Sequence, residues 1–249
     1  MNHFTKKSNF MRFGLFLCMF FSLALFSAVI LPGQAQAAYS WSRTLQVGDQ
    51  GSDVKELQIR VAGFAADWPS NSYVDADGVF GEQTKAAVVR FQRAYGLTAD
   101  GVVGPQTEQA LNNLEDSDHS TKHFDWNEFY SQDGSQFSGG MVDAATVKEN
   151  VRRMMWKLEA LRKKAGDQPV IINSGYRSVS HNTAVSGSAD QSQHQYGIAA
   201  DVAVVGQSAS KVSTLAKTCG FSGIIIHDDF VHLDNRIEYN YGATFWWWE

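Results

Sequence analysis

Two histidines and one aspartate in the C-terminal half of the chain are of the types that bind a catalytic metal ion. His194 and Asp201 lie in the stretch SQHQYGIAAD, and His232 follows in HDDFVHLD. Because burying a lone carboxylate is costly, Asp201 in its apolar stretch needs a partner, and a metal ion is one. Two histidines and one carboxylate, with a fourth position left for water, are the usual donors of a catalytic zinc ion. On these residues alone, histidines that merely pack in the core remain the alternative.

Three further residues could take part in hydrolysis beside such a metal ion. Asp229 precedes His232 by three residues and could reach a metal-bound water, whose pKa zinc lowers to about 7. Its carboxylate could accept the proton and later pass it to a leaving amine. Arg177 ends the stretch NSGYR, where its guanidinium could hold a carbonyl oxygen or a terminal carboxylate. His227 could act in catalysis or only as a hydrogen-bond partner behind the metal ligands.

Short apolar runs and two helical patterns must position these side chains. PVIINSGYR and GIAADVAVV have the composition of strands, and GIIIH and FVHLD that of two short strands joined by a tight Asp-Asp turn. The alternation within the second run places Ala199, Asp201 and Ala203 on one face of a sheet. Residues 143–166 and 208–220 have apolar side chains at helical spacing. Helices followed by a cluster of short strands predict an α+β domain with a small antiparallel sheet.

An imperfect repeat precedes this domain. DADGVFGEQTKAAVVRFQ at 75–92 is echoed by TADGVVGPQTEQAL at 98–111. In each copy the Asp-Gly pair and the second Gly suit a tight turn with positive φ, and the Thr suits a helix N-terminus. Upstream, GDQGSDVKELQIRVAGF has apolar residues on one helical face. These segments predict a small bundle of three helices over 39–114.

Composition and the N-terminal segment together indicate an exported globular protein. The chain has 249 residues, is 44% hydrophobic and carries a net charge of −5, so we expect no nucleic-acid-binding surface. Residues 1–38 contain a basic start, an apolar run and the small-residue stretch AQAA, which together predict a cleaved signal peptide. An uncleaved membrane anchor is the alternative, because the apolar run approaches the length of a membrane span. Only Cys219 remains after cleavage, so we expect no internal disulfide.

Asp234 and the C-terminal tail could each take one of two roles. Asp234, two residues after His232, could pin the last strand or contact a metal ligand from behind. The ending FWWWE contains three consecutive tryptophans, which cannot all face the core. We expect this tail to close the domain, and contact with a sugar or with the cell wall is the alternative.

The motifs resemble two families of bacterial cell-wall proteins. SGYRS, SQHQYGIAAD and HDDFVH are similar to the zinc D-alanyl-D-alanine carboxypeptidases of the M15 peptidase family, in particular its secreted actinomycete-type members. GDQGSDVKELQ, DGVFGEQTKAAVVRFQ and GLTADGVVGPQT resemble the peptidoglycan-binding module found beside many wall hydrolases. The resemblance implies zinc ligands at His194, Asp201 and His232. It also implies a catalytic acid at Asp229, a substrate-binding arginine at Arg177 and a further active-site histidine at His227.

The resemblance implies a zinc metallocarboxypeptidase that removes the terminal D-alanine from peptidoglycan stem peptides. We expect one Zn²⁺ per chain, a monomer, and a secreted protein that is extracellular or associated with the cell wall. Membrane contact would require an uncleaved signal segment. The implied order is a signal peptide (1–38), a peptidoglycan-binding domain (39–114), a linker (115–123) and a catalytic domain (124–249). An endopeptidase of the same fold that cuts cross-bridges, or a non-catalytic wall-binding protein with a structural zinc ion, are the alternatives.

Overall fold

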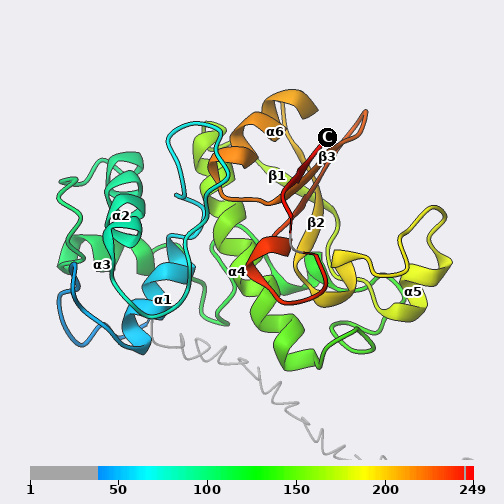
Figure 1. Ribbon diagram of the computed structural model, residues 1–249, viewed down its shortest axis with the longest axis horizontal. Helices are drawn as coiled ribbons and strands as arrows, with labels where there is room; N and C mark the ends of the chain where they lie inside the picture. The colour runs from blue at the N-terminus through cyan, green and yellow to red at the C-terminus, as the bar shows by residue number, and fades with distance from the viewer. Residues whose placement is uncertain (1–38, 244) are drawn as a thin grey trace, which may run out of the picture. The chain divides into compact units, whose positions relative to one another are not determined.

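The computed structural model describes residues 39–243 and 245–249, and the predicted signal peptide lies outside these residues. The α-helices are α1 (Ser52–Arg60), α2 (Glu82–Ala94), α3 (Pro105–Asn112), α4 (Ala144–Lys164), α5 (Val179–Ala184) and α6 (Ala209–Thr218). The strands are β1 (Val170–Ser174), β2 (Ala199–Val204), β3 (Gly223–Ile226), β4 (Val231–Asp234) and β5 (Trp247–Trp248) (Figure 1). Short 3-10 helices are η1 (Trp126–Phe129), η2 (Gln193–Tyr196) and η3 (Arg236–Glu238). The predicted α+β class, with a helical N-terminal part and a C-terminal sheet, is confirmed.

The first copy of the sequence repeat forms a hydrogen-bonded turn between α1 and α2. Gln58 of α1 is buried, and its Nε2 donates to Oδ1 of Asp77 (2.8 Å) and Oγ1 of Thr84 (3.1 Å). Its Oε1 accepts from the backbone N–H of Gly78 (2.8 Å), which has a positive φ of 78°. Thr84 therefore lies inside the first turn of α2 and holds Gln58, while Gly81 occupies the N-cap position.

The second copy repeats this arrangement between α2 and α3. Nε2 of buried Gln92 donates to Asp100 (3.0 Å) and Thr107 (3.1 Å), and its Oε1 accepts from the backbone N–H of Gly101 (2.9 Å). Because buried amides must be hydrogen-bonded, each glutamine fixes the turn that joins its helix to the next one. The repeat in the sequence thus corresponds to the same hydrogen-bonded turn, formed twice around a buried glutamine.

The sheet has the strand order β1-β2-β4-β3-β5. The first four strands are antiparallel, as the sequence predicts, and β3 and β4 form the hairpin (Figure 1). The fifth strand differs, because the C-terminal tail returns along the outer edge of β3 and pairs with it in parallel. The backbone N–H groups of Trp247 and Glu249 donate to the carbonyls of Ser222 and Ile224, both at 2.8 Å. The tail therefore covers a strand edge that would otherwise be open.

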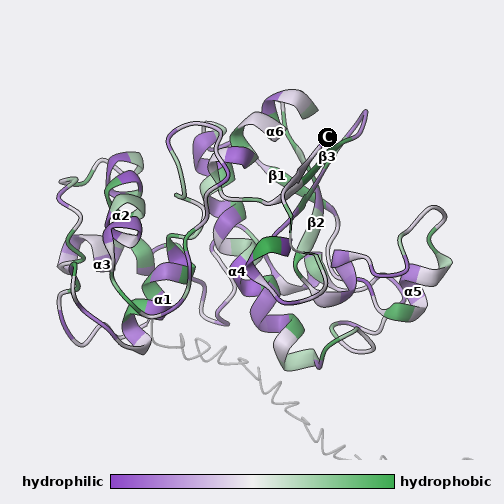
Figure 2. Ribbon diagram, viewed as in Figure 1, coloured by the Kyte–Doolittle hydropathy of each residue, from purple (hydrophilic) through white to green (hydrophobic). Residues whose placement is uncertain are grey.

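The two faces of the sheet have different roles. One face packs its apolar side chains, including Val202, Ile224 and Leu233, into a core shared with α4 and α6. Along α4, hydrophilic and hydrophobic residues alternate, so that one side of the helix can join this core (Figure 2). Asp201 and His232 point to the other face, because strand residues alternate between faces.

Residues 115–123, which the sequence predicts to be a linker, form hydrogen-bonded turns. Glu115 and Thr121 make an isolated antiparallel bridge, and Thr121 is buried. The backbone N–H and ring Nδ1 of His123 lie 3.0 and 2.9 Å from the carboxylate oxygens of Glu159 on α4. Within 39–243 and 245–249, no helix is both long and apolar enough to cross a membrane.

Candidate metal centre

Three potential metal ligands converge on the open face of the sheet. Asp201 on β2 pairs directly with His232 on β4, and His194 lies in η2, just before β2. Nδ1 of His232 is 2.9 Å from Oδ1 of Asp201, and Nε2 of His194 is 3.3 Å from the same oxygen. The two ring nitrogens are 3.2 Å apart, and all three donor atoms lie within 4.8 Å of one another. The residues predicted as zinc ligands are therefore brought together.

The far side of each imidazole ring determines which nitrogen can bind a cation. Nδ1 of His194 lies 2.6 Å from the carbonyl oxygen of Gly175, and Nε2 of His232 lies 3.1 Å from Oδ2 of Asp234. A carbonyl and a carboxylate only accept hydrogen bonds, so both of these nitrogens carry hydrogen. In the neutral rings, the nitrogens that face Asp201 then carry lone pairs.

A cation fits between these groups. Two nitrogen lone pairs and a carboxylate repel one another at such distances unless positive charge lies among them. Burial alone would lower the pKa of His232, but its hydrogen bonds to the carboxylates of Asp201 and Asp234 raise that pKa to about 9. Two imidazoles and one carboxylate are the donor set of catalytic zinc sites, so the residues fit Zn²⁺.

Asp234 and Arg236 support His232 from behind. The carboxylate of Asp234 is fully buried and accepts hydrogen bonds from Nε (2.9 Å) and Nη2 (2.5 Å) of Arg236. A carboxylate behind a ligating histidine orients its ring and raises its basicity. Asp234 therefore contacts a candidate metal ligand from behind, which is one of the two roles its spacing allows. A β-carbon at Gly223 would overlap this carboxylate, so the neighbouring strand needs glycine there.

Arg177 lies on the β1 side of the candidate ligands. Its Nη2 donates to Oδ2 of Asp201 (2.6 Å), and its Nε donates to Oγ of Ser174 (2.9 Å). Its backbone N–H donates to the carbonyl of His194 (3.1 Å), which ties the loop after β1 to η2. Arg177 and the three candidate ligands line one cleft of about 450 Å³. Its guanidinium therefore lies in the same cleft as the three candidate ligands.

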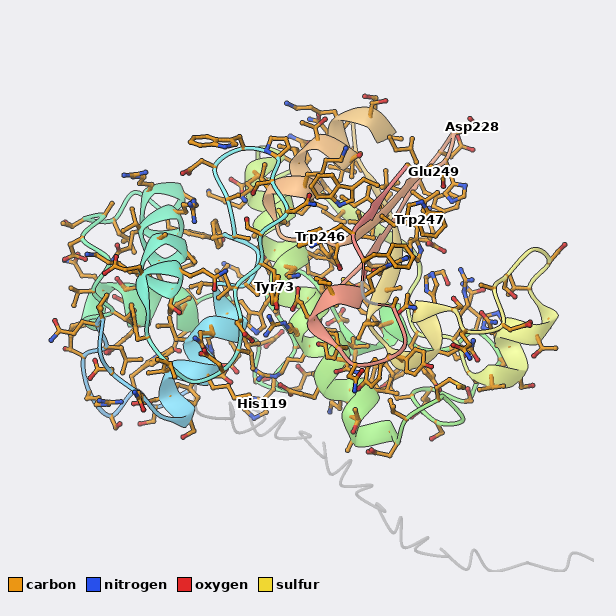
Figure 3. The ribbon with its side chains drawn as sticks, in the orientation of Figure 1. Tyr73, His119, Asp228, Trp246, Trp247 and Glu249 are labelled. Atoms are coloured by element: carbon orange, nitrogen blue, oxygen red, sulfur yellow. The ribbon has the colours of Figure 1, made fainter. Side chains whose placement is uncertain are left out.

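The β3–β4 hairpin carries the two other predicted catalytic residues. His227 lines the cleft and stacks on Phe230, with ring centroids 4.3 Å apart. Asp228 and Asp229 form the exposed turn, and Figure 3 shows Asp228 at the free end of the hairpin. Asp229 is not among the described residues that line the cleft. His227 thus lies along the same cleft as the candidate ligands, whereas Asp229 lies in an exposed turn and is absent from the described lining.

Sequence reasoning did not identify two other cleft residues, Arg236 and Trp247. Arg236 follows Asp234 by two residues in the sequence, but its type alone does not distinguish it from a surface arginine. Trp247 belongs to a tail whose pairing with β3 leaves no pattern in the sequence. The backbone carbonyl of Gly175, which fixes the ring of His194, could not be identified from the sequence either, because every residue has a backbone carbonyl.

Known proteins show similarity in both parts of the chain. The Peptidase M15 family matches residues 122–234 of this chain, and the family described as a putative peptidoglycan binding domain matches residues 50–111. The zinc D-Ala-D-Ala carboxypeptidase of Streptomyces albus G is 41% identical over 206 residues, which cover 81% of this chain and 79% of that protein. A probable N-acetylmuramoyl-L-alanine amidase of Bacillus licheniformis is 40% identical over 90 residues, covering 36% of this chain and 25% of that protein.

One solved structure is also similar to this chain. The crystal structure of the SleB N-terminal domain is 37% identical, with a TM-score of 0.25, and the match covers 29% of this chain and 93% of that one. The similarity to the Streptomyces enzyme extends over most of both proteins, and the M15 match contains all three candidate ligands. The chain therefore belongs to the M15 peptidase family.

Proposed function

We propose that this protein is a zinc D-alanyl-D-alanine carboxypeptidase that releases the C-terminal D-alanine from peptidoglycan stem peptides. The observation that carries the proposal is the convergence of His194, Asp201 and His232, with donor atoms within 4.8 Å, in a cleft that Arg177 also lines. The Streptomyces relative, whose name gives this activity, supports the choice of substrate. The enzyme would act outside the cell or in the cell wall after removal of residues 1–38.

His194, Asp201 and His232 would hold the zinc ion. When bound, zinc supplies a Lewis acid that polarises a carbonyl oxygen and favours ionisation of water. Gly175 and Asp234 keep the two imidazole rings in the required orientation. The protein's part in metal binding is therefore to present one nitrogen of each ring and one carboxylate.

Arg177 would position the substrate. Its Nε and Nη2 are held by Ser174 and Asp201, so the guanidinium is fixed before substrate binds. A guanidinium binds a terminal carboxylate by short charge-assisted hydrogen bonds. With the carboxylate of the last residue at Arg177, the preceding peptide bond would lie beside the three ligands.

Proton transfer would fall to Asp229. Its carboxylate would accept a proton from the attacking water and deliver it to the amine of the departing D-alanine. Hydrogen bonds in a catalytic site often form only with substrate bound, and Asp229 follows the cleft residue His227 by two positions. His227, already in the cleft, would contact the same reacting groups.

The N-terminal module would hold the enzyme on its substrate. The match of residues 50–111 to a putative peptidoglycan binding domain supports this role. Attachment to the polymer raises the local concentration of stem peptides around the cleft.

The experiment uses the mature protein and a pentapeptide stem that ends in D-Ala-D-Ala. We expect one zinc ion per chain, and release of D-alanine that stops with a chelator and returns with added zinc. His194→Ala should lose both zinc and activity. His181→Ala is the matched control, because that ring contacts Ser131 and does not line the cleft formed by described residues. A folded, zinc-loaded protein that releases no D-alanine would overturn the proposal, and cutting of cross-linked wall would then identify an endopeptidase.

A further inference from the structure

The cleft extends across the sheet beyond the metal ligands. Directly paired residues place Ser174, Asp201, His232 and Ile225 in one row that crosses β1, β2, β4 and β3. Paired residues on neighbouring strands point to the same face of a sheet. The row therefore begins beside Arg177 and continues past the metal ligands toward the outer edge.

A second row brings the C-terminal tail to the same face. Asp234 pairs with Gly223, and Gly223 pairs with Trp247. Trp247 thus shares a face with Ile225, and both line the cleft. Since Gly223 has no side chain, the space between Asp234 and Trp247 is left for Arg236, whose guanidinium carbon lies 5.0 Å from the ring centroid of Trp247.

Arg236 is a nearly buried cation whose hydrogen-bonding capacity is only partly used. It is 6% exposed, and its Nε and Nη2 are bound to Asp234. Within the described residues, its Nη1 has no hydrogen-bond partner, and Arg236 lines the cleft. A guanidinium held in this way can donate hydrogen bonds to an anion, in a geometry that is set before the anion binds.

The length of the cleft suits a short peptide. Strands are about 4.8 Å apart, so β1 and β5 are separated by roughly 19 Å, and an extended peptide rises about 3.3 Å per residue. Roughly five residues can therefore reach from Arg177 to Trp247. With the C-terminal carboxylate at Arg177, the residues before the scissile bond would lie over β3 and β5.

We propose that Arg236 and Trp247 form a subsite for a carboxylate-bearing residue of the peptide that precedes the scissile bond. Nη1 of Arg236 binds the carboxylate, and the indole face of Trp247 packs against the aliphatic part of the same residue. This inference rests on the proposed function, which supplies the direction of the peptide. Both residues lie beyond the segment 122–234 that matches the M15 family.

The first test compares substrates on the unaltered enzyme. One peptide ends in D-Ala-D-Ala and carries a free carboxylate two or three residues before the scissile bond, and its twin carries the amide instead. We expect kcat/KM for the acid to exceed that for the amide by about tenfold, since remote contacts contribute to the transition state. Equal values for the two peptides would overturn the inference without any variant having to fold.

The second test uses variants of the tail. In Trp247→Ala, the ratio of kcat/KM for the acidic peptide over that for acetyl-D-Ala-D-Ala should fall about tenfold, with part of it restored in Trp247→Phe. Trp246→Ala is the matched control, because that ring contacts Tyr73 and Trp248 and is not among the described cleft residues. In Figure 3, Trp246 is labelled between Trp247 and Tyr73. Arg236→Lys should remove the preference for acid over amide.

The outcomes separate this inference from the function on which it rests. An enzyme that releases no D-alanine from any peptide contradicts the carboxypeptidase proposal. An active Trp247→Ala enzyme with an unchanged substrate ratio contradicts the subsite alone. If the effect of Trp247→Ala on kcat/KM depended on which C-terminal residue is released, Trp247 would contact the released residue and not the peptide before the scissile bond. That result would also overturn the inference.

Discussion

Asp228 and Asp229 are adjacent carboxylates in the turn of the β3–β4 hairpin, and only Asp229 has the spacing of the catalytic acid. Both are exposed, so their surroundings differ little. We expect Asp229→Asn to lower kcat for D-alanine release by about a hundredfold or more, because a positioned acid-base group contributes at least that much. Zinc content should stay unchanged, since Asp229 is not one of the three converging donors.

Asp228→Asn is the matched control for this measurement and should retain activity within about twofold. Equal, small losses in both variants would show that proton transfer does not depend on Asp229. His227, which already lines the cleft, would then be the residue to replace next, with the same D-alanine assay as the readout.

Asp234 acts through His232, and its replacement tests the orientation of that ring. In Asp234→Asn, the amide forms weaker hydrogen bonds with Nε2 of His232 and with Arg236. Loss of a carboxylate behind a ligating histidine typically weakens metal binding by about 10–100-fold. Competition with a chelator of known affinity measures this change, and zinc retention equal to that of the unaltered protein would contradict it.

At the residue scale, the sequence predicted the side chains that converge and named Asp234 as a possible partner behind them, but it did not predict the carbonyl behind His194. His194, Asp201 and His232 stand out because their types and spacing match a zinc donor set. The partners behind the rings are a backbone carbonyl, at Gly175, and a carboxylate, at Asp234. Which backbone group lies behind a ring depends on the path of the loop after β1, and residue types do not encode that path directly.

At the scale of elements, Gly223 on β3 shows how closely the strands surround Asp234. A β-carbon there would overlap the buried carboxylate, so Gly223→Ala should disturb both the sheet and the orientation of His232. Overpacking of this kind costs about 1–3 kcal/mol, which should lower the melting temperature by several degrees. Calorimetry and zinc titration measure the two effects.

Gly81→Ala provides the comparison. Gly81 has a φ of −93°, and nothing lies within 4 Å of the added carbon. Because only an N-cap preference is lost, we expect a cost below about 1 kcal/mol and unchanged zinc binding. A larger loss of stability in Gly81→Ala than in Gly223→Ala would contradict the crowding around Asp234.

The periodicity of the sequence predicts most of the strands and helices. It predicts only in part which strands pair with one another. Alternating or continuous apolar runs predicted β1 to β4, and an Asp-Asp turn predicted the hairpin. The parallel pairing of β5 was not predicted, because a two-residue strand has no period to detect. The polar stretch 115–123 shows the same limit, since composition does not distinguish a linker from turns that bury Thr121.

At the scale of the whole molecule, the N-terminal helices and the peptidase part share buried contacts. One apolar cluster contains Leu57 of α1 and Leu158 of α4. Nη1 and Nη2 of Arg152 on α4 each donate to Glu56 on α1 at 2.9 Å. Units joined by a common core and a partly buried ion pair should unfold together, so we expect a single thermal transition.

Replacing Glu56 tests this coupling. Glu56→Gln keeps the shape but removes the charge that Arg152 and Arg60 face, which should cost about 1–2 kcal/mol and lower the melting temperature by about 4 °C. Glu149→Gln is the matched control: it faces the same Arg152, but its side chain is 55% exposed, and such pairs contribute little. Two separate transitions, with only the first one shifted, would show that the parts unfold independently.

The same pair predicts how stability depends on pH. Burial alone would raise the pKa of Glu56, but its hydrogen bonds to Arg152 and its interaction with Arg60 lower it below the ordinary value of 4.5. Its contribution is therefore complete above that ordinary value and is lost as pH falls through the lower pKa of the folded state. The difference in melting temperature between the unaltered protein and Glu56→Gln should thus be constant from pH 8 to about 6 and shrink below about 4. A difference that grows on acidification would mean that Glu56 is not stabilised as a carboxylate, and the contact between α1 and α4 would then depend on the apolar cluster alone.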